Sequence, residues 1–169
     1  GIVVSTLGLI LKQQVGESFG IAGYSIGVVS LTGIILGLRW IVRGIGSPIL
    51  GSVADKIGRE RPIPILFLLG AIALSVSGIW SGPILLIVFT VIFFICGTTL
   101  DTLLSAQAAQ SGTRVVASFV TAIDLGMSVG PLIGWGIPQF GFPTSYILIS
   151  GSAIYMIGAI VALKKFGLS

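Results

Sequence analysis

Long apolar stretches separated by short polar breaks run through this chain from end to end. The breaks fall at residues 13–18, 47–61, 81–83, 105–113 and 138–143, and most of them contain glycine or proline, the residues that typically punctuate loops. The apolar segments between them cover about residues 1–13, 21–51, 64–80, 83–104, 114–135 and 144–163. Because a membrane-spanning helix needs roughly 20 apolar residues, the pattern predicts an all-α, polytopic bundle of six helices in one domain, residues 1–169.

The first segment, about Gly1 to Gln13, is too short to cross a membrane unless residues precede it. It is apolar from Gly1, without the charged start of a signal peptide. We therefore expect the sequence to begin inside a spanning helix of a longer chain.

The composition agrees with an integral membrane protein. Charged residues make up 8% of the chain, against about 25% in soluble domains, and the mean hydropathy is +1.14. There is no histidine, and Cys96 is the single cysteine, so we expect no metal site, no disulfide, no cofactor and no enzymatic activity. Cys96 lies in an apolar run and is expected to be a buried hydrophobic residue.

The net charge of +4 follows from where the basic residues lie, so nucleic acid is not needed as a partner. If the 52–62 loop is cytoplasmic, the alternation of six spans places the 105–114 loop and the C-terminus on the same side. Those regions hold Lys56, Arg59, Arg61, Arg114, Lys164 and Lys165, whereas the opposite side holds only Lys12. This positive-inside bias predicts the orientation, in what we expect to be a bacterial plasma membrane. An aromatic belt at the outer boundary would consist of Tyr24, Trp80, Trp135 and Tyr146.

The break between the second and third segments carries the most specific pattern in the chain. Its spacing, Gly-x-x-x-Asp-Lys-x-Gly-Arg, is formed by Gly51, Asp55, Lys56, Gly58 and Arg59. This resembles the signature loop that joins the second and third helices of a six-helix half in the major facilitator superfamily of secondary transporters. The departure is Glu60, where that family usually has a basic residue, and Arg61 supplies the charge one place later.

The resemblance implies one half of a twelve-helix transporter, built from two inverted three-helix repeats. The other half would be the rest of the same chain or a second copy. The sequence 37–40 ahead of Ser47-Pro48, and the end at 164–167, resemble the C-terminal half more than the N-terminal one. Segments one, two, four and five would then line a central cavity for a small solute, and segments three and six would face lipid. Asp55 would be either a latch that favours one access state or a simple helix cap.

The fifth segment carries glycines at every fourth position, Gly126, Gly130 and Gly134, beside Pro131. Such a small-residue face lets another helix approach closely, and the missing amide of Pro131 weakens the helix locally. The pattern partly resembles the glycine–proline motif of antiporters in the same superfamily. It departs at two positions, Ala117 and Trp135. Because similar sequences occur on the eleventh helix, a packing face and a coupling element both remain possible.

Four charges lie inside the predicted spans, and a charge at the bilayer centre costs about 2.5–3.5 kcal/mol. Arg39 and Arg43 are one helical turn apart, so they share a face of the second segment. We predict an ion pair between Arg43 and Asp101, a proton-carrying role for Asp124, and a contact of Arg39 with an anionic group of the substrate beside a wall formed by Trp40. The alternative is that all four charges form static pairs that hold the bundle together.

Two classes of function remain after this reading. One is a secondary transporter that moves a small solute by alternating access, either coupled to protons or as a uniporter. The other is a membrane scaffold or assembly subunit that retains the fold without transport. Charges within the membrane separate the two classes, because a scaffold has little reason to retain them.

Overall fold

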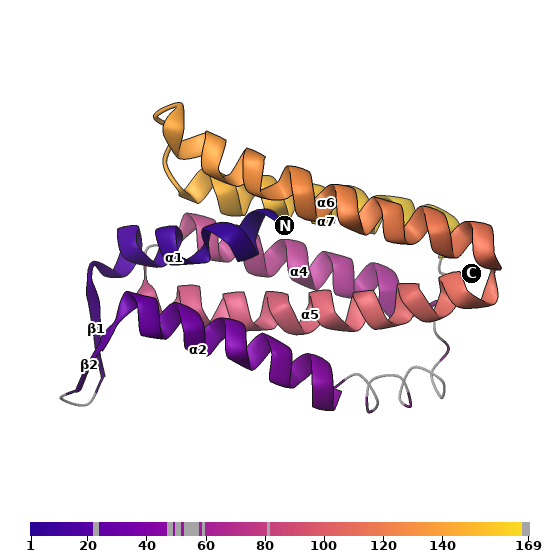
Figure 1. Cartoon of the computed structure of the whole chain (residues 1–169), viewed down its shortest axis with the longest axis horizontal. Coiled ribbons are helices and arrows are strands. Elements are labelled where there is room, and N and C mark those ends of the chain that lie inside the picture. The colour runs from indigo at the N-terminus through magenta and orange to yellow at the C-terminus, as the bar shows by residue number, and fades with distance from the viewer. Residues whose placement is uncertain are drawn as a thin grey trace.

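A computed structural model gives the fold and describes residues 1–21, 24–46, 49, 52, 58, 60–80 and 82–166. Long helices run side by side along the molecule and make it mostly helical, as expected (Figure 1). They are α1 (Ile2–Val15), α2 (Val28–Ile41), α4 (Pro62–Ile79), α5 (Pro83–Gln110), α6 (Thr113–Gln139) and α7 (Ser145–Phe166), and a π-helical turn, η1 (Val42–Gly46), extends α2. Five spans, with α2 and η1 counted together, are long and apolar enough to cross a membrane, and α1 is shorter.

Local sequence signals set several helix ends. Pro62 and Pro83 stand at the first positions of α4 and α5, where the missing amide costs nothing and the fixed φ suits a helix. Gly112 separates α5 from α6 with a φ of +99°, and Gly141 follows α6 with a φ of +80°. Both lie in the left-handed region that only glycine adopts easily.

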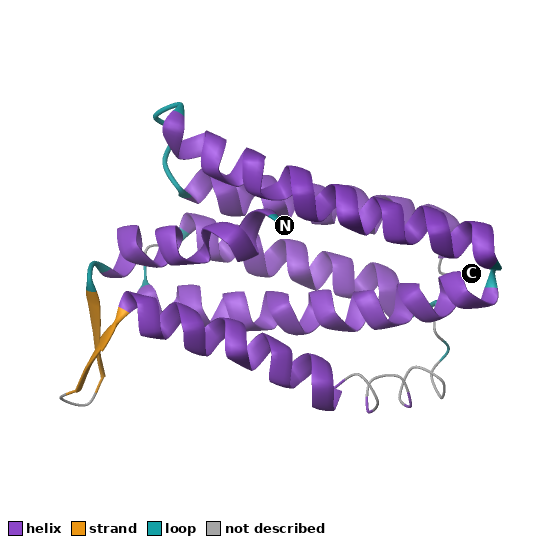
Figure 2. Ribbon diagram, viewed as in Figure 1, coloured by secondary structure: helices purple, strands orange, loops and turns teal. Residues whose placement is uncertain are grey.

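The predicted helix over 21–51 is wrong at its beginning. Ser18–Ile21 (β1) and Tyr24–Gly27 (β2) form an antiparallel hairpin at one end of the bundle, with Ser18 opposite Gly27 (Figure 2). Aromatic and β-branched residues alternate here with glycine and serine, a pattern that suits paired strands better than a helix. The helical stretch from Val28 to Gly46 still has 19 residues, enough to span without the hairpin.

The predicted polar loop at 105–113 is also largely wrong. The α5 helix continues to Gln110, because the alanines and glutamines of residues 106–110 are good helix formers whatever their polarity. The turn before α6 is reduced to Ser111 and Gly112. The helix α5 is therefore longer than a hydrocarbon layer of about 30 Å requires.

Three helices form the tightest part of the bundle, with α4 packed against both α5 and α7. Between α4 and α7 lies a buried polar contact: the Ser152 hydroxyl donates to the Ala71 carbonyl oxygen (2.8 Å), and the Ser75 and Ser152 hydroxyl oxygens are 2.7 Å apart. Because the single hydroxyl proton of Ser152 is donated to the Ala71 carbonyl, the Ser75 hydroxyl donates to Ser152. In contrast, α2 and α6 leave most of their surfaces exposed.

Tyr155 of α7 occupies a niche made by glycines of two neighbouring helices. A Cβ atom on Gly70 of α4 would lie 2.6 Å from the Tyr155 ring, and one on Gly97 of α5 would lie 3.0 Å from its hydroxyl. The ring also makes edge contacts with Phe67 (5.6 Å between centroids) and Phe93 (5.1 Å). The two glycines thus fix where the tyrosine hydroxyl lies.

We expect Gly70→Ala to destabilise the protein, because the added methyl group would displace the Tyr155 ring. Overpacking of this kind typically costs about 1–3 kcal/mol. Gly33→Ala is the matched control, since a Cβ at Gly33 of α2 would meet nothing within 4 Å. Detergent-solubilised variants unfolded with increasing dodecyl sulfate would show the difference. Equal midpoints for the two variants would contradict the niche.

Candidate functional site: a charged cavity between the helices

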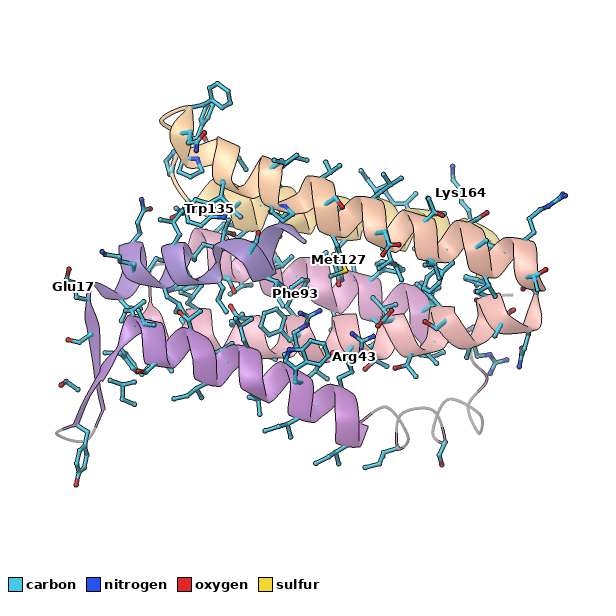
Figure 3. All side chains as sticks on the ribbon, viewed as in Figure 1. Glu17, Arg43, Phe93, Met127, Trp135 and Lys164 are labelled. Carbon is cyan, nitrogen blue, oxygen red and sulfur yellow. The ribbon has the colours of Figure 1, made fainter. Side chains whose placement is uncertain are left out.

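An open cavity of about 620 Å³ lies midway along the bundle. The four elements predicted to line it do so: the start of α1, α2 with η1, α5 and α6. Contrary to the prediction that segments three and six face lipid, residues of α7, and Leu74 of α4, also line the cavity. Figure 3 shows side chains from these elements in the central region, among them Arg43, Phe93 and Met127.

The predicted ion pair between Arg43 and Asp101 is confirmed. The Nη2 atom of Arg43, on η1, lies 2.8 Å from Oδ2 of Asp101, on α5. Both side chains are partly exposed to the cavity, 48% for Arg43 and 31% for Asp101. The Arg43 guanidinium also stands over the Trp40 ring, 5.6 Å from its centroid. The pair therefore holds the end of the α2 span against α5.

Arg39 enters the same cavity one helical turn before Arg43. Its guanidinium carbon lies 5.6 Å from the centroid of the buried Phe94 ring on α5, within the range of a cation–π contact. Among the residues that the structure describes, Arg39 forms no ion pair. Trp40 lines the cavity as predicted for a wall, although its side chain is mostly exposed.

Asp124 does not join the other intramembrane charges. It is exposed on α6 and is not among the residues that line the cavity, which on this helix include Ile123, Gly126 and Gly130. Within the described part of the chain it forms no ion pair. Its predicted role as a proton carrier stays a prediction, and the geometry separates it from the Arg43–Asp101 pair.

The small-residue face of α6 packs against α1, as predicted. A Cβ on Gly130 would lie 2.7 Å from the Cα of Gly1 and from the backbone nitrogen of Ile2, and one on Gly134 would lie 2.9 Å from the Thr6 methyl group. Gly126 differs from Gly130 and Gly134, because a Cβ added to it would meet no atom within 4 Å. Pro131 lies inside the helix, which continues past it to Gln139.

Most of the segment that resembles the transporter signature loop lies outside the described residues, namely Gly51, Asp55, Lys56 and Arg59. Gly58 has a φ of +96°, so its backbone is in the left-handed region, in keeping with the tight turn predicted there. Arg61 immediately precedes α4 and is exposed. Next to it, the Glu60 carboxylate accepts a hydrogen bond from Gln107 of α5 (3.0 Å).

The described charges at the two ends of the bundle are unequal. Arg61, Arg114, Lys164 and Lys165 lie at the end where α6 begins and α7 finishes, together with Glu60. The hairpin end has Lys12 and Glu17 (Figure 3). This distribution matches the charge bias read from the sequence.

Sequence reasoning missed two polar residues of the cavity, Thr98 of α5 and Tyr155 of α7. Both lie in the middle of apolar spans, whereas polar residues such as tyrosine and threonine are common at the ends of spans. That position was a signal available in the sequence.

Comparison of the chain with protein-family models, with curated proteins and with solved structures finds no match in any of the three.

Proposed function

We propose that this chain is one half of a secondary transporter of the major facilitator type, which moves a small solute by alternating access. The observation that carries the proposal is the cavity itself: Arg39, Arg43 and Asp101 meet in it, midway along helices long and apolar enough to span a membrane. Such sites near the midplane are where secondary transporters bind their substrates.

The energetic cost of the charges supports this proposal over a scaffold. Arg39 lies about 17 Å along the α2 span at 1.5 Å per residue, near the middle of a hydrocarbon layer of about 30 Å. Each central charge costs about 2.5–3.5 kcal/mol on the mild insertion scale. A protein that only held partners together would gain nothing from a charged cavity of about 620 Å³ at that depth.

The exposed faces beside the cavity support a second half as partner. The helices α2 and α6 flank the open cavity and are the most exposed of the spans. On α2, the Cβ positions of Gly33 and Gly37 are open, so another backbone could approach there. A second six-helix half, from the same chain or a second copy, would enclose the cavity between two bundles in the lipid bilayer.

The test is flux in proteoliposomes that contain the intact protein expressed from its whole reading frame. Counterflow of radiolabelled solutes, with a carboxylate, a sugar and an amine as the panel, should reveal uptake of at least one that protein-free vesicles lack. An imposed proton gradient should accelerate it if transport is proton-coupled. Asp124→Asn should then abolish the acceleration and spare the counterflow, because only the coupling needs the proton. No flux of any solute would favour the scaffold.

A further inference from the structure

We propose that the cavity selects small organic anions, and that Arg39 binds their carboxylate; that such an anion is transported rests on the function proposed above. Among the described residues, the charged side chains that line the cavity are two cations and one anion, Arg39, Arg43 and Asp101. Asp101 is held by Arg43 at 2.8 Å. Arg39 is thus the cation left over, and within the described residues no carboxylate pairs with it.

Arg39 is held in place for a ligand by an aromatic ring. Its guanidinium carbon lies 5.6 Å from the centroid of the Phe94 ring, which is 4% exposed and packed within the core. A cation–π contact engages the face of a guanidinium, whereas its edge carries the donors that grip a carboxylate with two parallel hydrogen bonds. A preorganised donor of this kind loses little side-chain entropy when it binds.

The depth of Arg39 along its helix argues against a lipid headgroup as the natural occupant. At about 17 Å along the span, it lies near the middle of a hydrocarbon layer of about 30 Å, far from the phosphates at either surface. The anion must therefore enter from water through the open cavity.

The rest of the cavity suits an apolar body attached to that carboxylate. Trp40 and Phe93 line it on one side, and Ile123 and Met127 of α6 on another. The volume of about 620 Å³ lies in the range of small-molecule sites, about 300–1,000 Å³. An inorganic anion would leave these apolar walls unused, so the geometry favours an aromatic or branched carboxylate.

The experiment compares three probes of one shape and different charge: benzoate, benzamide and benzylamine. The intact protein in phosphatidylcholine vesicles is titrated with each, and binding is followed by equilibrium dialysis of the labelled probe. We expect benzoate to bind at least tenfold more tightly than either of the others. Arg39→Gln should remove that preference and leave benzamide unchanged, whereas Arg39→Lys should keep part of it.

Arg114→Gln is the matched control, because it removes an exposed cation at a helix end outside the cavity. It should leave benzoate binding unchanged. Adding phosphatidylglycerol to the vesicles should not displace benzoate; displacement would mean that a lipid headgroup occupies Arg39 and would overturn the proposal. Equal binding of benzoate and benzamide, or tighter binding of nitrate than of benzoate, would overturn it as well.

The binding and flux experiments can reject the anion site and the transporter independently. Benzoate bound through Arg39 without counterflow of any solute would remove the transporter and keep the anion site. Counterflow of benzoate that is unaffected by Arg39→Gln would keep the transporter and overturn the anion site. If Arg39→Gln does not fold, Phe94→Leu, which removes the stacking ring and retains the charge, should weaken benzoate binding several-fold, and unchanged binding would count against the site.

Discussion

Gly130→Leu is expected to push α1 away from α6 and to destabilise the folded bundle strongly. Even the first atom of the new side chain would lie 2.7 Å from the Cα of Gly1 and from the nitrogen of Ile2. These are backbone atoms, which cannot turn aside as a flexible side chain would. We expect a loss of about 3 kcal/mol or more, at the upper end of the cost of overpacking, measured by unfolding in dodecyl sulfate.

Gly126→Leu is the control on the same helix, one turn earlier. Its Cβ would meet nothing within 4 Å, so the folded bundle should tolerate it. Because Gly126 lines the cavity, that leucine would instead reduce the space for a ligand. Equal stability of the two variants would show that α1 does not pack against the glycine face of α6.

Asp101→Asn should have the second large effect, since it leaves Arg43 without its carboxylate. We expect a loss of about 1–2 kcal/mol, below the 3–5 kcal/mol of fully buried pairs, because the Arg43 side chain is 48% exposed. It should also raise the side-chain charge of the cavity by one unit and tighten the binding of benzoate.

A double-mutant cycle with Arg43→Gln separates the pair from its surroundings. If the double variant recovers both stability and flux, the pair only holds η1 against α5, as the static alternative requires. Recovery of stability without flux would mean that transport needs the charges themselves, beyond their role in holding η1 against α5. Additive losses from the two single variants would show that the 2.8 Å contact contributes no coupling energy.

The Arg43–Asp101 pair could be predicted because two constraints converged on it. Unpaired charges are costly within a membrane, and the resemblance to a known arrangement of helices made the second and fourth segments neighbours. No such pair of constraints existed for the hairpin. Over residues 18–27 the alternation of aromatic and β-branched residues with glycine and serine favours strands, but the long apolar run that follows predicts a helix, and the pairing of β1 with β2 decides between them.

The position of Asp124 shows that the sequence predicts the depth of a residue along a helix more easily than the direction in which its side chain points. Its depth was estimated from residue number, but the direction of a side chain depends on which face of the helix is packed. Gly130 faces α1, and Asp124 lies six residues earlier, so at 100° per residue the two positions point about 120° apart around the helix. That angle was readable from the sequence once the packed face was known. The niche of Tyr155 was not, because it needs Gly70, Gly97 and Tyr155 on three helices to meet.

The solitary thiol of Cys96 has a practical consequence. It is the one cysteine of the sequence, and it is buried at 4% exposure, where maleimide reagents reach it poorly. Maleimide labelling of this chain without an introduced cysteine should therefore be low, which makes a cysteine introduced elsewhere easy to detect. A cysteine introduced at Ile123 or Met127, on the α6 wall of the cavity, would report from each side of the membrane which way the cavity opens.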